Sequence, residues 1–251
     1  MKKISMICLL FFTSVWSCET AAAAESEGTV QFAPASGIVD PVHPYHPEEK
    51  IELVDAVSEE SPASGQEGPL SIDFASSFDF GANKISAQDQ VYFAEAQAQK
   101  DVQDTTAPFV QVSDHRGVAT GWILTLKQNG QLRTSAKTEP QELSGAQIVL
   151  KNAQVSSIVT DIDKPEARQE IQLDPAGTET VVLSAGKGAG SGTWTVYWGT
   201  LKEITKENST GRNEGMQVAE GIALKVPGSI LKAPATYHTE LIWNLKDIPK
   251  N

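Results

Sequence analysis

From Pro69 onward, apolar and polar residues alternate along the chain in short runs. Leu70, Ile72 and Phe74 are separated by polar residues, and Trp122, Leu124 and Leu126 likewise stand at alternate positions. Because successive side chains of a β-strand point to opposite faces, this alternation is typical of strands with one face in a core. The other runs of this kind contain Val110 and Val112, Ile148 and Leu150, Val181 to Leu183, Trp194 to Trp198, Ile222 to Val226, and Leu241 to Leu245.

Turn-forming residues separate most of these runs, including Asn129-Gly130 and Pro227-Gly228. Short strands joined by such turns predict an antiparallel, sandwich-like β-domain. The segment 85–99 is ambiguous, because Ser86 to Asp89 resembles a helix capping box while the following residues fit a helix or a strand equally well. We therefore predict an all-β domain with at most one short helix.

The first residues of the chain do not follow this pattern. An apolar run over residues 4–12 comes after Lys2 and Lys3, and four alanines end at Ala24. This layout is typical of a secretory signal peptide, so residues 1–24 are expected to be removed and the protein to be secreted.

Residues 25–66 are rich in proline, acidic and small residues. Prolines at this density lack backbone donors and favour an extended chain, so we predict a disordered arm rather than a packed unit. The folded domain is then expected to span residues 67–251.

Both cysteines, Cys8 and Cys18, lie inside the predicted signal peptide. The mature chain would therefore have no disulfide, no thiolate metal ligand and no cysteine nucleophile. Cys18 also stands in a position where a bacterial lipoprotein could be lipidated, although the bulky Trp16 fits that pattern poorly. A lipid anchor is the alternative to cleavage after Ala24.

The formal net charge of the chain is −12. Such a chain gains nothing from phosphate electrostatics, so binding to nucleic acid or simple attraction to anionic membranes is not expected. After the signal peptide there is no second run of about 18 apolar residues, so we predict no transmembrane segment. An anionic partner would have to be held by hydrogen bonds, stacking, a local basic patch or bridging cations.

Few side chains suit a metal site. His43 and His46 lie in the proline-rich arm with no cysteine nearby, and we expect both to be solvated. Asp161, Asp163 and Glu166 could contribute oxygen ligands to calcium, but acidic loop residues are more often simply solvated. We predict no metal site and no other cofactor.

A short W-x-L signature occurs twice, first with Trp122 and Leu124 and again, close to the C-terminus, with Trp243 and Leu245. In an extended strand the Trp and the Leu of each signature share one face, and the middle residue faces the other way.

Six segments carry a resemblance to a known family. They read GPLSIDFASSFDFG, QVSDHRG, GWILTL, GSGTWTVYWG, LKVPG and YHTELIWNLKDIP. Across residues 67–251 they resemble the WxL-domain surface proteins of low-GC Gram-positive bacteria, and closely those of enterococci. Two W-x-L signatures in this order make the resemblance specific.

The resemblance implies a secreted protein that the WxL domain holds non-covalently on the cell wall, with peptidoglycan as the usual ligand. It also implies partners at the cell surface, namely WxL-interacting proteins and other WxL proteins in a multi-protein complex. An alternative is a module whose ligand is another surface protein rather than glycan, recruited by exposed strand edges or by the proline-rich arm.

The resemblance implies a binding surface at Trp122, Leu124, Trp243 and Leu245. Tryptophan rings stack well on sugar rings, but neighbouring leucines on the same strand face favour a core position for both motif tryptophans. Other aromatic side chains would then be the possible exposed contacts. These are Trp194, Tyr197, Trp198 and Tyr237.

A wall hydrolase is the enzymatic alternative. Only His115 and His238 lie in the predicted domain, without the spacing of metal ligands, and no G-x-S-x-G elbow is present. A pair of carboxylates could still serve a glycosidase in so acidic a chain. We predict no enzymatic activity and no catalytic residue.

Overall fold

The computed structural model describes residues 27–58, 65–207 and 213–248 of the 251. The chain divides into two compact units, Met1–Phe32 and Ala33–Asn251. Of the first unit, residues 27–32 are exposed and have no regular secondary structure. The predicted signal peptide lies outside the described residues.

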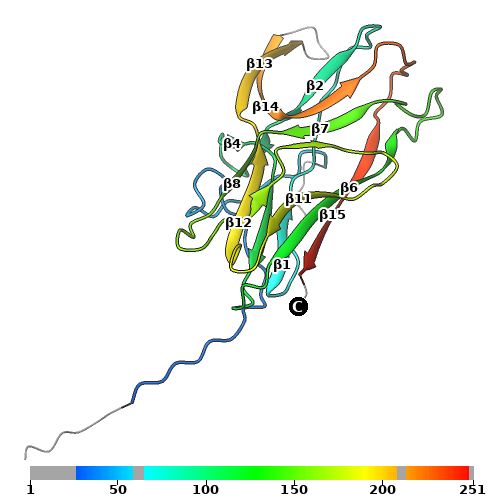
Figure 1. The fold of residues 1–251 in the computed structure, drawn as a ribbon. Coiled ribbons are helices and arrows are strands. Elements are labelled where there is room, and N and C mark those ends of the chain that lie inside the picture. Colours follow the sequence, from blue (N-terminus) through cyan, green and yellow to red (C-terminus); the bar gives the residue numbers. More distant parts are fainter. Residues whose placement is uncertain (1–26, 59–64, 208–212, 249–251) are drawn as a thin grey trace, which may run out of the picture. The chain divides into compact units, whose positions relative to one another are not determined.

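Every regular element among the described residues is a β-strand, which confirms the predicted fold class (Figure 1). The strands are β1 (Leu70–Ala75), β2 (Gln90–Glu95), β3 (Gln97–Ala98), β4 (Thr105–Thr106), β5 (Phe109–Asp114), β6 (Trp122–Arg133), β7 (Gln147–Lys151), β8 (Ala153–Ser156), β9 (Glu166–Ala167), β10 (Glu170–Gln172), β11 (Thr180–Ala185), β12 (Gly192–Trp198), β13 (Leu201–Glu207), β14 (Asn213–Val226) and β15 (His238–Asp247).

Three larger antiparallel sheets make up the domain. Their strand orders are β1-β5-β12-β8, β10-β7-β14-β13 and β15-β6-β11-β9, and β2 also pairs with β14. Strands β3 and β4 form a small sheet of their own. Neighbouring strands are mostly distant in sequence; the last strand, β15, lies beside β6 (Figure 1).

One apolar cluster draws buried side chains from all three larger sheets. Trp122 and Leu124 of β6, Leu150 of β7 and Trp198 of β12 are fully buried in it. Burying each such side chain is worth roughly 1.5–3 kcal/mol, so these few residues anchor the sheets to one another.

The ambiguous segment 85–99 contains the strands β2 and β3, and no helix. The side chains of its apparent capping box make other bonds: Ser86 Oγ accepts from Gln88 N, and Asp89 Oδ1 accepts from Gly228 N at 2.8 Å. Both acceptors thus serve turns, while the apolar residues that follow pair with β14. Long-range strand pairing decided between the two local possibilities.

The proline-rich arm is not separate from the domain, and the prediction of an unpacked, disordered arm is wrong for residues 40–55. Leu53 is 4% exposed and joins Phe74 and Phe109 in a second apolar cluster. The compact unit therefore begins at Ala33 rather than at residue 67. We call residues 40–55 the N-terminal strap.

Hydrogen bonds hold the strap on the first sheet. The side-chain carbonyl of Gln111 accepts from Val42 N at 2.8 Å, and its amide donates to Asp40 O at 3.1 Å. The hydroxyl of Tyr45 accepts from Ala107 N at 2.8 Å. Prolines supply no donors, but the residues between them supply the bonds that fix the strap.

Gln111 also belongs to a buried polar network beneath the strap. Its amide donates to Asp73 Oδ2 at 3.0 Å, and the hydroxyls of Ser71 and Ser113 donate to the same carboxylate. Burial raises the pKa of Asp73 in spite of these bonds. The network fixes the Gln111 side chain in the orientation that receives the strap.

His43 is buried within the strap, with 3% of its surface exposed, so the prediction that it is solvated is wrong. Its Nδ1 accepts from Tyr45 N and His46 N at 3.2 and 3.1 Å. The proton of the neutral ring therefore sits on Nε2, which lies 3.3 Å from Asp104 Oδ2. His46 is exposed, as predicted.

Candidate functional site

The two W-x-L motifs lie side by side on the adjacent strands β6 and β15. In the antiparallel register Leu124 is opposite Leu245, and Trp243 is opposite Leu126. Residues that face each other in this way have Cβ atoms about 4.5–5.5 Å apart, so their side chains touch. Two signatures that are far apart in sequence therefore form one structural element.

The first motif belongs to the core. Trp122 and Leu124 are both fully buried. The indole Nε1 of Trp122 donates to the carbonyl of Gly190 at 3.0 Å, which satisfies its only polar group. The interpretation of the motif tryptophan as a core residue is confirmed for Trp122.

The second motif lies at the surface of the same sheet. Trp243 and Leu245 are half-buried on β15, which forms one edge of the sheet. The Trp243 ring packs against the ring of Trp198, with centroids 6.2 Å apart and planes tilted by 33°. Of the two motif tryptophans, Trp243 is the one that keeps part of its ring accessible.

Two of the four other aromatic residues are not exposed, so their prediction as exposed contacts is wrong. Trp194 is 3% exposed and donates through Nε1 to Ser191 O, and Trp198 is fully buried against Phe78 and Trp243. Because strand side chains alternate, Trp194 and Trp198 share the inward face of β12.

Tyr197 and Tyr237 are half-buried. The Tyr197 hydroxyl donates to Gln154 Oε1 at 3.2 Å, and burial raises its pKa. The Tyr237 hydroxyl accepts from Ala233 N and donates to Pro140 O, both at 3.0 Å. Both tyrosines are thus held in place, and a role for them in binding stays a prediction.

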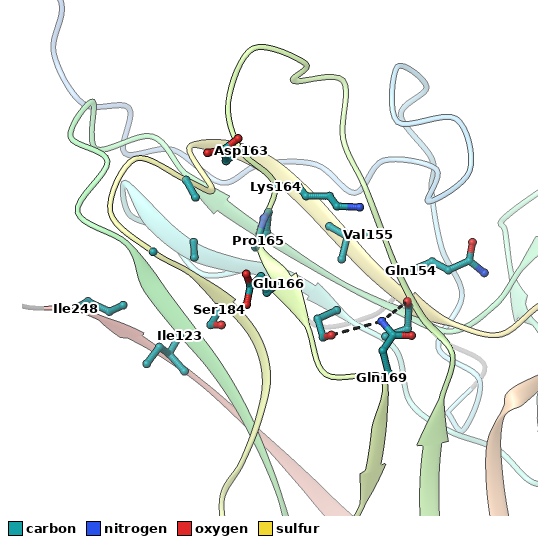
Figure 2. A pocket seen from close by; sticks show the side chains of 15 residues that line it. Ile123, Gln154, Val155, Asp163, Lys164, Pro165, Glu166, Gln169, Ser184 and Ile248 are labelled. Atoms are coloured by element: carbon teal, nitrogen blue, oxygen red, sulfur yellow. Dashed lines mark hydrogen bonds between the residues drawn. The ribbon is translucent and has the colours of Figure 1, made fainter.

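A groove of about 1150 Å³ opens beside the first motif (Figure 2). Ile123, the middle residue of that motif, lines it from β6. The remaining lining residues come from β8, from β9 and the segments on either side of it, from the end of β11 with the following turn, and from Ile248. They are Ala153, Gln154, Val155, Asp163, Lys164, Pro165, Glu166, Ala167, Gln169, Ser184, Ala185, Gly186, Ala189 and Ile248.

Trp122 supports one wall of this groove from beneath. Gly190 accepts from the indole through its carbonyl, and its own N–H donates to Asp163 O at 2.9 Å. Gly190 has a φ of 72°, and a Cβ at this position would collide with Ala185 and lie 2.9 Å from the indole nitrogen. The buried tryptophan therefore shapes a surface that it does not itself present.

An arginine clamp beside the first motif was not identified from the sequence. Arg116 donates through Nε and Nη2 to the two carboxylate oxygens of Asp114, each at 2.8 Å, and through Nη1 to Asp247 of β15. The hydrogen bond from Arg116 lowers the pKa of Asp247. Asp247 is opposite Trp122 in the register, so the clamp fixes β15 next to the motif.

A signal for this clamp is present in the segment QVSDHRG, where the acidic residue that ends a strand and a basic residue stand two positions apart. That spacing suggests a local ion pair. The contact of Arg116 with β15 could not be predicted from that spacing, because Asp247 is far from Arg116 in the sequence.

A family model described as "WxL domain surface cell wall-binding" matches residues 19–249. The chain belongs to the WxL-domain family. No curated protein and no solved structure gives a significant match. The match to the WxL domain begins well before residue 67, and the strap, which packs on the sheets, lies within the matched region.

In the part of the WxL domain that the structure describes, no group of three or more His, Cys, Asp or Glu side chains lies close enough to hold a metal ion. Asp163 and Glu166, two of the three acids considered for calcium, both line the groove.

Among the described residues of the WxL protein, no helix meets the length and apolarity required to span a membrane.

Proposed function

We propose that this WxL protein binds peptidoglycan non-covalently at the cell surface and serves there as a non-catalytic attachment module. The family description supports cell-wall binding at the surface. The observation that carries the proposal is the juxtaposition of both W-x-L motifs on β6 and β15, beside a groove lined by Ile123 of the first motif.

The two motifs have different parts in this proposal. Trp122 and Leu124 are buried and build the surface, whereas Trp243 and Leu245 keep accessible area at the edge of the sheet. A partly exposed indole offers an apolar face to the polymer and keeps its other face on the core. Truncating Trp243 should therefore weaken binding without leaving a large cavity in the core, unlike truncation of the fully buried Trp122.

Secretion and assembly belong to the same proposal. The apolar run and alanines of residues 1–24 would direct export, and the protein would then join other WxL proteins and WxL-interacting proteins in a surface complex. Because the chain is acidic, added salt should weaken its attachment to an anionic wall little.

A second candidate function is binding to another surface protein, and one observation favours it. Strand β15 is ten residues long and forms a sheet edge, and residues 241–245 along it are only half-buried. An exposed edge of this length is a template for an added strand.

Cosedimentation with purified, protein-free peptidoglycan separates the two functions. The chain from Glu25 onward is compared with Trp122→Ala and Trp243→Ala, and Trp194→Ala is the buried-tryptophan control outside the motifs. Circular dichroism shows which variants remain folded. Retention of the wild type, weakened in a folded Trp243→Ala variant, supports peptidoglycan binding at the motif surface. If protein-free walls do not retain the wild type, the proposal fails and a protein partner is favoured.

A further inference from the structure

We infer that the groove beside the first motif recognises the peptide part of the wall polymer rather than its sugar rings. This inference rests on the proposed function, because it names the component of peptidoglycan that the domain reads. Four features of the groove carry it: a free strand edge, a lining without aromatic residues, a wall of small residues and a lysine that has no ion-pair partner among the described residues.

The groove exposes the outer edge of β8. Gly199 N donates to Asn152 O, so alternate residues from Asn152 onward direct their backbone groups toward β12. Ala153 faces the other way, and its carbonyl accepts from the side-chain amide of Gln169 at 3.1 Å (Figure 2). The same alternation turns the N–H and C=O of Val155 into the groove, where the backbone of an extended peptide could pair with them.

Sugar rings find no stacking surface in this groove. None of its lining residues, all of which lie in the described part of the chain, is aromatic. Trp122 lies behind the wall and is fully buried, and Trp194 and Trp198 are also buried. Since stacking on aromatic faces is the main way in which proteins hold sugar rings apart from hydrogen bonding, the lining favours a different ligand.

Small residues leave room for side chains of a bound peptide. Five of the fifteen lining residues are alanine or glycine. They are Ala153, Ala167, Ala185, Gly186 and Ala189. Ile123 and Ile248 add apolar surface to the same groove. An extended peptide would direct alternate side chains to this surface while its backbone faces β8.

Lys164 supplies the positive charge of the groove, which Asp163 and Glu166 also line. It is exposed, its side chain extends over the groove toward the Val155 side (Figure 2), and it takes part in none of the ion pairs found among the described residues. The peptides of peptidoglycan carry free carboxylates and amides. In the intact polymer the lactyl carboxyl groups of the sugar backbone are bonded to these peptides and carry no charge. Lys164 can pair with such a carboxylate, and the acidic Asp163 and Glu166 of the same lining can accept from the amide N–H groups of the peptide.

The first experiment compares two polymers. Intact, protein-free peptidoglycan is divided, and one half is treated with an amidase that removes the peptides. The lactyl carboxylates that this hydrolysis frees on the glycan strands are then converted to neutral amides, so that the stripped glycan carries no new charge. We expect the stripped glycan to retain at least about tenfold less protein, which corresponds to the loss of one charge-assisted contact. Soluble peptides released by the amidase should displace the protein from intact walls. Equal retention on both polymers overturns the inference, whereas no retention on the intact polymer instead overturns the proposed function.

The second experiment uses paired variants on the intact polymer. Val155→Pro removes the N–H that faces the groove, and Val155→Ala is its control because it keeps that donor. Lys164→Gln removes the groove charge, and Lys187→Gln removes a nearby exposed charge that does not line the groove. We expect Val155→Pro and Lys164→Gln to bind severalfold more weakly and the two controls to bind like the wild type. Wild-type retention of a folded Lys164→Gln variant overturns the inference even if Val155→Pro fails to fold.

Discussion

Leu124 of β6 and Leu245 of β15 lie directly opposite each other, so the leucines of the two W-x-L motifs form a cross-strand pair. Leu124 is fully buried and Leu245 is half-buried. The pair joins the last strand of the domain to the core at the point where both motifs meet. This contact requires one leucine from each W-x-L motif.

This pairing predicts coupling between the two motifs. Leu124→Ala should cost about 2–5 kcal/mol of unfolding free energy, and Leu245→Ala should cost less because it is half-exposed. In a double-mutant cycle the two changes should interact by roughly 0.2–1 kcal/mol. Urea unfolding gives the unfolding free energy of the wild type, the two single variants and the double variant.

Leu53 provides the control for this cycle, because it belongs to the separate apolar cluster with Phe74 and Phe109. Leu53→Ala combined with Leu245→Ala should be additive. Additive behaviour of the motif pair as well would show that the two leucines do not act together.

Gly190 should not tolerate any side chain. Gly190→Ala places a methyl group against Ala185 and the Trp122 indole at a positive φ, so we expect a loss of more than about 1 kcal/mol of stability. Gly186→Ala is the matched control, since a Cβ there meets nothing within 4 Å. Thermal unfolding gives the midpoint temperature of each variant. Equal midpoints would contradict the inference that Trp122 and Gly190 pack tightly under the groove wall.

The N-terminal strap should contribute to the stability of the domain. A chain that starts at Gly65 loses the burial of Leu53 and the bonds from Val42 and Tyr45, so its unfolding free energy should fall by at least about 2 kcal/mol. A chain that starts at Asp40 keeps these contacts and should unfold like the longer protein. Equal urea midpoints for the two truncations would mean that the strap is not part of the folded unit.

Local patterns in the sequence predicted most strands but not their neighbours. The alternation that begins at Trp122 identifies a strand by itself, whereas its pairing with β15 depends on a register set by the whole domain. The burial of Trp194 and Trp198 could not be predicted for a related reason: their spacing shows that they share a face, but only the packed sheets determine that this face is inward.

The strap and the groove were beyond sequence reasoning for another reason. Proline content argued for disorder, but the order of the strap depends on Gln111, a side chain of a distant strand. The groove combines residues of four strands and their connections, including the small residues that no motif identifies. Such sites exist only once long-range contacts have formed.

The arginine clamp gives the stability of the domain a pH dependence. Arg116 lowers the folded-state pKa of Asp247, so this ion pair stabilises the fold at pH values above the ordinary Asp pKa of about 3.9. The contribution is lost as the pH falls through the lowered pKa. Arg116→Gln should therefore be less stable than the wild type near neutral pH, and the difference should shrink as the solution is acidified.

Thermal unfolding of the wild type, Arg116→Gln and Asp247→Asn over this pH range measures the effect. Asp247→Asn removes the titrating group and should show a smaller loss than Arg116→Gln, because Arg116 keeps both bonds to the buried Asp114. Hydrogen exchange should show faster opening at the C-terminal end of β15 in both variants. A stability difference that stays constant with pH would show that the ion pair between Arg116 and Asp247 does not stabilise the fold and does not fix β15 beside Trp122.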